Sequence, residues 1–275
     1  MLKSHHVQNF VSKNMYDENE IISSLPQDMD SNNDNVNQYK NTDISNNDNA
    51  RISEDKALTE NANRKCPFQA PSIKNTNGGY FYSEKEILKR HRLFDPGFGT
   101  VLIDLLENQS VVDIGAGVGQ FGYFLKKHNA NVDWTGFDGG NNIEEFWGKN
   151  YALGGDKDYV IPEVCWIDAS QPIKLERTFD WTISVEVGEH IHKKYESIFI
   201  DNLISLSRKG VILTWAVKGQ GGHRHINCQN NDYIISEMAK RGMIYDAEIS
   251  QTLRDAVVKL GYLRNTAMVF RKTSL

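Results

Sequence analysis

A glycine-rich loop between a predicted strand and a predicted helix constrains the fold of this chain more than any other feature. Residues 111–122 read Val-Val-Asp-Ile-Gly-Ala-Gly-Val-Gly-Gln-Phe-Gly. A short apolar run precedes the glycines, and Phe121, Phe124 and Leu125 follow them at helical spacing. Because glycine has no Cβ, such a loop can turn sharply and let a ligand approach the backbone. The loop therefore predicts a strand–loop–helix unit with a ligand at the turn.

Strand-like and helix-like segments alternate along the rest of the chain. We expect strands over residues 110–114, 131–137, 179–187, 211–217, 244–249 and 266–271, and helices over residues 83–92, 98–106, 119–128, 195–207, 232–241 and 253–260. The helix over residues 195–207 is expected to end before Gly210. This alternation predicts an α/β fold with a mostly parallel sheet, and the last two strands fit an antiparallel pair.

The glycine spacing bears on the kind of ligand. Gly115, Gly117 and Gly119 form Gly-x-Gly-x-Gly, whereas a dinucleotide fingerprint has Gly-x-Gly-x-x-Gly. Asp113 directly precedes the loop, and a carboxylate there favours a ligand with a cationic amine. A nicotinamide-dependent oxidoreductase is an alternative that the spacing disfavours.

Acidic residues follow two further strand-like runs. Asp138 ends the second predicted strand, where a carboxylate can accept both hydroxyls of a ribose. Asp168 follows the next apolar run and can accept a hydrogen bond from an adenine amine. Ile167 or Ala169 would then lie alongside the ring.

Four segments in this order resemble the class I S-adenosylmethionine-dependent methyltransferases. They are Asp-Ile-Gly-Ala-Gly-Val-Gly, Phe-Asp, Ile-Asp-Ala and Phe-Asp-Trp-Thr-Ile-Ser-Val-Glu-Val-Gly-Glu-His-Ile, and the resemblance covers about residues 80–272. It implies a Rossmann-like, seven-stranded, mostly parallel sheet with helices on both faces and an antiparallel last strand. It also implies S-adenosyl-L-methionine as the cofactor. The expected cofactor-binding residues are Asp113, Gly115, Ala116, Gly117, Gly119, Asp138, Asp168, Ala169 and Glu186.

The loop after the strand expected over residues 179–187 carries the first candidate catalytic groups, Glu189 and His190. It resembles the Val-x-Glu-His segment of small-molecule methyltransferases and lacks the Asn/Asp-Pro-Pro-Tyr motif of enzymes that methylate base amines. His190 is a candidate general base, because histidine titrates near neutral pH. The alternative is that Glu189 and His190 only support the cofactor pocket.

The loop after the strand expected over residues 211–217 contains three glycines followed by His223 and Arg224. Such a loop can close over a substrate, with His223 as a third candidate catalytic residue. The alternative is a surface connection. His223, His225 and Cys228 do not form a standard zinc pattern, so we expect no metal. Tyr80, Phe81 and Tyr82 could cap the acceptor pocket, or they could be core residues.

These features predict a methyltransferase that acts on a small-molecule or sugar-like acceptor at oxygen. The alternatives are a protein or RNA methyltransferase, and a catalytically silent protein with a methyltransferase fold. Residues 65–275 contain 25 basic and 25 acidic side chains, so the excess of positive charge typical of nucleic-acid binders is missing. We therefore do not expect nucleic acid to be a partner. The sequence leaves the oligomeric state open.

Residues 1–64 differ in composition from the rest of the chain. They hold 6 basic and 11 acidic side chains, and residues 28–50 include 8 Asn and 5 Asp. We expect a disordered tail over residues 1–64 and a methyltransferase domain over residues 65–275. The start has no secretory signal pattern, no apolar run is long enough for a bilayer, and three cysteines do not suggest a disulfide scaffold. These observations favour a cytoplasmic protein without a membrane partner.

Overall fold

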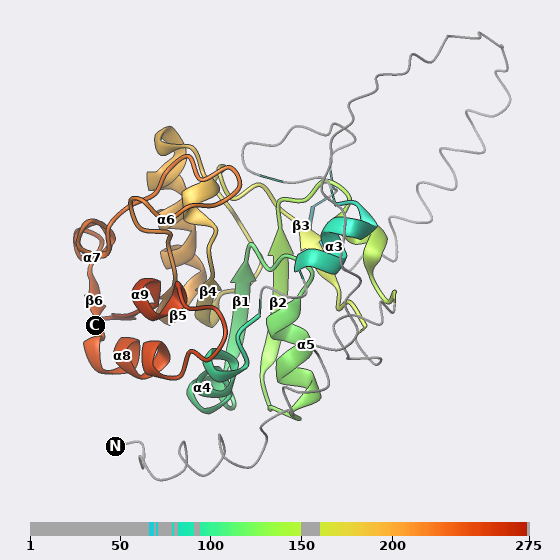
Figure 1. Ribbon diagram of the computed structural model, residues 1–275, viewed down its shortest axis with the longest axis horizontal. Helices are drawn as coiled ribbons and strands as arrows, with labels where there is room; N and C mark the ends of the chain where they lie inside the picture. The colour runs from blue at the N-terminus through green and yellow to red at the C-terminus, as the bar shows by residue number, and fades with distance from the viewer. Residues whose placement is uncertain are drawn as a thin grey trace, which may run out of the picture. The chain divides into compact units, whose positions relative to one another are not determined.

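The computed structural model describes residues 66–68, 70, 79, 82–90, 94–149 and 160–273. The chain divides into two compact units, Met1–Pro67 and Phe68–Leu275. The elements described here belong to the second unit (Figure 1). The predicted tail over residues 1–64 lies outside the described residues, as do Tyr80 and Phe81.

A seven-stranded sheet organises this unit. The strands are β1 (Ser110–Ile114), β2 (Asp133–Asp138), β3 (Val164–Trp166), β4 (Phe179–Ser184), β5 (Ser207–Leu213), β6 (Met243–Tyr245) and β7 (Met268–Lys272). Their order across the sheet is β3-β2-β1-β4-β5-β7-β6. The first five strands pair in parallel, and β7 is antiparallel to both β5 and β6. The predicted α/β fold with an antiparallel last strand is confirmed.

The helices are connected to the strands as the alternation predicts. They are α3 (Glu84–Arg90), α4 (Pro96–Leu106), α5 (Gln120–Lys127), α6 (Glu196–Leu206), α7 (Asn231–Ala239), α8 (Ala247–Asp255) and α9 (Leu263–Thr266), with short 3-10 turns η2 (Ile143–Phe146), η3 (Gly188–His190) and η4 (Lys193–Tyr195). α3 begins with a capping box, because Ser83 Oγ accepts from the Glu86 N–H and the Glu86 carboxylate accepts from the Ser83 N–H.

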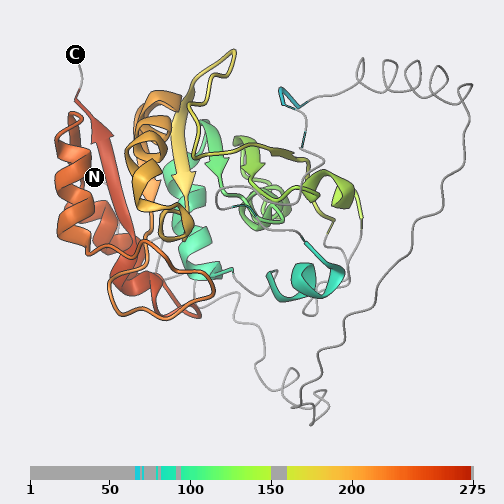
Figure 2. The same ribbon diagram turned by 90° about the horizontal axis from the view of Figure 1, so that it is seen from above.

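Two groups of helices pack on the strands. Residues of α4, α5, α8 and α9 form one apolar core with residues of β1, β4, β5 and β7. α6 lies along β4 and β5 (Figure 2). It buries Phe199, Ile200 and Leu203. No helix of the described residues is long and apolar enough to span a bilayer.

Two predicted boundaries near the middle of the sheet are wrong. The strand expected over residues 179–187 stops at Ser184, because Glu186 adopts a left-handed conformation (φ 54°) that breaks the extended chain. Gly210 does not follow the end of a helix, since β5 already begins at Ser207. A Cβ on Gly210 would lie 2.3 Å from the Phe270 carbonyl oxygen and 2.5 Å from the Trp181 ring. Glycine is therefore required here by close packing within the sheet.

The prediction for residues 244–260 is also wrong. The strand β6 ends at Tyr245, and α8 begins at Ala247, six residues before the helix that we expected. Asp246 sets this boundary, because its carboxylate caps the helix by accepting the Ile249 N–H at 3.1 Å. The short helix α9 was not predicted at all.

One expectation about cysteine is wrong as well. Cys165 in β3 is disulfide-bonded, whereas Cys228 carries a free thiol. The odd number of cysteines in unrelated contexts gave no signal for this bond.

Candidate functional site

The predicted site residues follow the carboxyl ends of parallel strands. The strand order reverses between β1 and β4, so the loops after these two strands leave the sheet side by side. Ser184 Oγ at the end of β4 donates to the Ile114 carbonyl at the end of β1 at 2.7 Å, which holds these two strand ends together. The Glu186 N–H donates to Thr214 Oγ1 at 2.8 Å, which joins the residues after β4 to those after β5. Open α/β sheets bind ligands at such a reversal.

The glycine loop turns tightly at this point. The N–H groups of Gly115 and Ala116 both donate to the Phe137 carbonyl, at 2.8 and 2.9 Å. Gly115 has φ 84°, and a Cβ there would lie 2.3 Å from Val187 Cγ2. Only glycine combines this conformation with such close contact to the loop after β4. The loop ends at Gly119, which directly precedes α5.

Asp113 is a buried carboxyl group at the end of β1. It is 1% exposed, and its Oδ2 has no hydrogen-bond partner among the described residues. Burial raises the pKa of Asp113 to about 7, because removal from water disfavours the ionised form. The nearby Trp134 side chain opposes this rise, and the negative charge of Asp138 adds to it. A cationic group beside Oδ2 would satisfy this oxygen and restore its charge.

Asp138 holds the glycine loop from the end of β2. Its Oδ2 accepts the Gly117 N–H at 2.9 Å, and its Oδ1 accepts the Gly140 N–H and the Tyr82 hydroxyl, both at 2.8 Å. Tyr82 is therefore a buried neighbour of the site. These bonds fix the Asp138 carboxylate at the end of β2, beside the glycine loop.

Asp168 and Ala169 follow β3 in a tight turn. Asp168 Oδ1 accepts the Ser170 N–H at 2.9 Å and the Ser170 hydroxyl at 2.6 Å. The Ala169 carbonyl accepts from Asn202 Nδ2 at 3.0 Å, which ties the turn to α6. Parallel pairing of β2 with β3 places this turn beside Asp138, since the Ile167 N–H donates to the Asp138 carbonyl at 3.0 Å.

Glu186 lies in a strained turn after β4. Its left-handed backbone is unusual for a residue with a side chain, and such strain tends to occur at functional sites. The carboxylate accepts from Thr214 Oγ1 at 2.9 Å, Gln220 Nε2 at 2.8 Å and Thr266 Oγ1 at 3.3 Å. Burial raises the pKa of this carboxyl group above its usual value.

Glu189 is the most deeply buried of the candidate catalytic groups. Its side chain is inaccessible to solvent, and neither carboxylate oxygen has a hydrogen-bond partner among the described residues. Burial, together with the nearby charge of Glu186, raises the pKa of Glu189 to about 9. Burial therefore favours the neutral form of this carboxyl group, and a cation beside it would favour the ionised form.

The structure brings His225 to Glu189 and leaves His223 on the surface. His225 Nε2 lies 3.8 Å from Glu189 Oε1, and the ring of His190 packs edge-on against His225 with centroids 5.0 Å apart. His223 and His192 are both exposed. The sequence offered His223 and His225 two residues apart, and it carried no signal for choosing between them.

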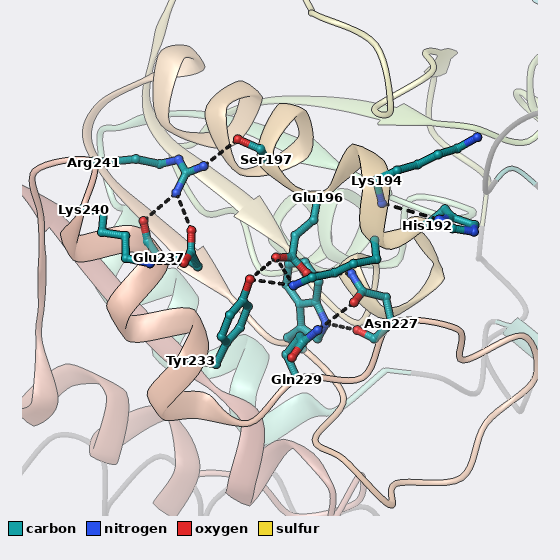
Figure 3. Close-up of polar contacts among 12 residues, drawn as sticks. His192, Lys194, Glu196, Ser197, Asn227, Gln229, Tyr233, Glu237, Lys240 and Arg241 are labelled. Carbon is teal, nitrogen blue, oxygen red and sulfur yellow. Dashed lines mark hydrogen bonds and ion pairs between the residues drawn. The ribbon is translucent and has the colours of Figure 1, made fainter.

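A polar network fixes the loop that carries His225. Glu196, buried at the start of α6, accepts from Asn227 Nδ2 at 2.8 Å and from Lys193 Nζ at 2.7 Å, and the Tyr233 hydroxyl also donates to it (Figure 3). The Asn227 carbonyl accepts the indole N–H of buried Trp215 at 2.7 Å. These contacts, none of which the sequence predicted, hold the loop against α6 and α7.

No protein-family model and no curated protein matches this chain. Among solved structures, it is similar to magnesium protoporphyrin IX methyltransferase from Synechocystis PCC 6803 with bound SAH, at 18% identity and a TM-score of 0.46, over 71% of this chain and 90% of that one. It is similar to the methyltransferase domain of bacterial CtHen1-C at 19% identity and a TM-score of 0.46, over 68% and 100%. It is also similar to a TehB-like SAM-dependent methyltransferase from Corynebacterium glutamicum ATCC 13032 Kitasato at 12% identity and a TM-score of 0.44, over 82% and 97%.

The order and direction of the strands define the fold class of this chain. It has a Rossmann-like α/β fold with seven strands and an antiparallel β7. This is the fold that the resemblance to the class I S-adenosylmethionine-dependent methyltransferases implied.

Proposed function

We propose that this protein is an S-adenosylmethionine-dependent methyltransferase that acts on a small-molecule or sugar-like acceptor at oxygen. The observation that carries the proposal is Asp113, a buried carboxyl group with an unpartnered oxygen beside a glycine loop at the strand-order reversal. The methionine part of the cofactor has an ammonium group, which is the kind of partner that this oxygen lacks. When bound, the cofactor supplies a methyl group already activated on a sulfonium.

Two further residues support the cofactor assignment. Asp138 is anchored to the Gly117 N–H, and a carboxylate held in this way can accept the hydroxyls of a ribose. Asp168 sits in the turn after β3, next to Asp138, where it can accept from an adenine amine. In this proposal Gly115, Ala116 and Gly119 shape the loop, and Ala169 lies alongside the base.

Glu186 would support the site rather than bind the cofactor by its side chain. Its carboxylate already accepts three side-chain donors from the loops and helix around it. We therefore propose that Glu186 shapes the turn between β4 and the candidate catalytic groups.

The acceptor would lie beside Glu189, His190 and His225. An acceptor hydroxyl must lose its proton as its oxygen takes the methyl group, and this cluster contains the groups able to promote that loss. Of the predicted catalytic residues, we keep Glu189 and His190 in the proposal. We replace the exposed His223 with His225, which contacts both.

Several alternatives differ in their observable behaviour. A silent fold would bind cofactor without turnover, and an oxidoreductase would bind NADH in its place. A protein or RNA methyltransferase would bind the cofactor equally well, and only a screen of acceptors separates it from our proposal. The cytoplasmic location stays a prediction, and the disulfide at Cys165 counts against it because disulfides are rare in a reducing cytosol.

The test compares Asp138→Ala with Asp180→Ala by titration calorimetry with S-adenosylhomocysteine. Asp180 is a matched control, because it lies at the start of β4, at the opposite end of the parallel strands from the proposed site. Its carboxylate accepts a hydrogen bond from the Ser110 N–H. We expect Asp138→Ala to weaken binding on the order of 10²-fold, since charge-assisted hydrogen bonds are lost. Asp180→Ala should bind as the wild type does. Equal affinity of the two variants would refute the cofactor site.

A further inference from the structure

A cluster of metal-binding side chains forms where the loops after β4 and β5 meet. Glu189, His190 and His225 each offer one ligand atom, and these atoms all lie within 4.8 Å of one another. The backbone holds the two loops in place, because the N–H groups of Ile226 and Asn227 both donate to the Glu189 carbonyl at 2.9 Å. The three side chains are therefore positioned before any ligand binds.

The Glu189 carboxylate is suited to bind a cation. It is fully buried, and neither oxygen forms a hydrogen bond of good geometry among the described residues. The backbone N–H groups of Glu189 and Ala216 and the acidic side chain of Glu186 lie near it. Its 3.8 Å separation from His225 Nε2 is too long for a hydrogen bond. Two ligand atoms that share one divalent ion at about 2.1 Å lie roughly 3–4 Å apart. An ion between these two atoms therefore fits the observed spacing and satisfies the carboxylate.

Both histidines are oriented as metal ligands are. His190 Nδ1 lies 3.1 Å from the Arg224 carbonyl oxygen, and His225 Nδ1 lies 3.3 Å from the Gln220 carbonyl oxygen. Because a carbonyl only accepts, each neutral ring carries its proton on Nδ1 and a lone pair on Nε2. A backbone carbonyl on the far nitrogen fixes the tautomer and orientation of metal-bound histidine in the same way.

We propose that Glu189, His190 and His225 bind one divalent transition-metal ion, such as Mn²⁺, Fe²⁺ or Zn²⁺. Two imidazoles and one carboxylate suit these ions, whereas Mg²⁺ and Ca²⁺ prefer oxygen ligands alone. This reverses the expectation of no metal. The sequence pattern could not reveal the site, because its ligands come from two loops that only the fold brings together.

The ion would also promote the loss of a proton from the acceptor. Three protein ligands leave coordination positions open, as in catalytic rather than structural metal sites. An acceptor hydroxyl bound there would lose its proton more easily, since a divalent ion lowers the pKa of bound oxygen ligands. This use rests on the proposed methyltransferase function, whereas binding of the ion does not.

The test is metal binding by the full-length protein after treatment with a chelator and dialysis. Titration calorimetry with MnCl₂ and with ZnSO₄, with bound metal counted by mass spectrometry, should give one ion per chain. Glu189→Gln and His225→Gln should weaken binding by more than the roughly 10–100-fold that loss of an outer-shell partner causes. His192→Gln removes an exposed histidine close to His190 and should bind as the wild type does.

Two readouts keep the test independent of folding defects. Added Mn²⁺ should raise the melting temperature of the wild type and of His192→Gln, and it should leave both ligand variants unchanged. The wild type loaded with Co²⁺ should show absorption bands of an imidazole-ligated ion. An absence of bound ion, the spectrum of aqueous Co²⁺, or equal affinity in the wild type and both ligand variants would overturn the proposal.

The same samples separate this proposal from the proposed function. The candidate cofactor residues Asp113, Asp138 and Asp168 lie at the carboxyl ends of β1, β2 and β3, away from the loops that carry the metal cluster. Metal-free protein should therefore still bind S-adenosylhomocysteine. Metal binding without cofactor binding would refute only the methyltransferase. Cofactor binding without metal binding would refute only the metal site.

Discussion

At the scale of single residues, the site holds two carboxyl groups that water does not reach. Asp113 Oδ2 and both oxygens of Glu189 are buried and lack hydrogen-bond partners among the described residues. Each such oxygen destabilises the folded state, because burial removes hydration and nothing replaces it. Both groups lie at the end of the sheet where a ligand is expected, which links the loss of stability to function.

Asp113→Asn should change how stability depends on pH. The pKa of Asp113 rises from 3.8 to about 7 on folding, so the folded state holds a proton that the unfolded chain releases between these values. The stability due to this proton is full below pH 3.8 and is lost as the pH rises through 7. The variant should therefore be more stable than the wild type by roughly 2–4 kcal/mol at pH 8, and similar to it at pH 4. Urea unfolding of both proteins at both pH values measures the difference in the free energy of unfolding. The same difference at pH 4 and at pH 8 would contradict the prediction.

Asp113 should also make cofactor binding depend on pH. An ammonium group attracts the ionised carboxylate, so wild-type affinity for S-adenosylhomocysteine should increase as the pH rises from 6 to 8. Calorimetry in buffers of different ionisation enthalpy should detect about one proton released per ligand at pH 6. In Asp113→Asn the affinity should be low at every pH in this range.

His190→Gln should lower turnover without affecting the cofactor. His190 belongs to the acceptor-side cluster, and loss of a group that promotes proton removal reduces turnover by about 10²–10⁴-fold. The exposed His192 provides the control, since His192→Gln removes a nearby imidazole outside the cluster. Initial rates with the acceptor found by screening, together with calorimetric cofactor affinities, measure the two effects. An unchanged rate would exclude this role for His190.

At the scale of secondary-structure elements, close packing within the sheet decides what sequence patterns cannot. Gly210→Ala should destabilise the protein by about 1–3 kcal/mol, because the new Cβ would overlap the Phe270 carbonyl and the Trp181 ring. Gly221→Ala is the control, since a Cβ at Gly221 meets nothing within 4 Å. Its effect should stay within about 0.5 kcal/mol. Equal urea midpoints for the two variants would contradict the packing described for β5.

The elements that the sequence predicted well are those with local signals. The strand Ser110–Ile114 has the predicted bounds, and the first-turn capping of α3 follows directly from Ser83 and Glu86. Residues 207–210 have no such signal, and only residues 211–213 of β5 fall within the strand expected over residues 211–217. Their strand depends on pairing with β4 and β7, so Gly210 resembled a helix terminator until the sheet was known.

At the scale of the whole sheet, parallel pairing brings residues that are distant in the sequence together at one edge of the sheet, where they form one site. Asp113, Asp138 and Asp168 could be predicted as a group, because each one follows a strand-like run and parallel strands end at one edge. His225 could not, because its position depends on the Glu189 carbonyl and on the network around Glu196. Long-range contacts of this kind leave no pattern in a single sequence.

In the proposed function, the edge of the sheet beyond β1, β2 and β3 binds S-adenosylmethionine. The most direct measurement is calorimetric titration of the full chain with S-adenosylmethionine, S-adenosylhomocysteine and NADH in parallel. We expect both adenosyl ligands to bind with one site per chain and NADH not to bind. Binding of NADH instead, or of none of the three, would contradict this proposal.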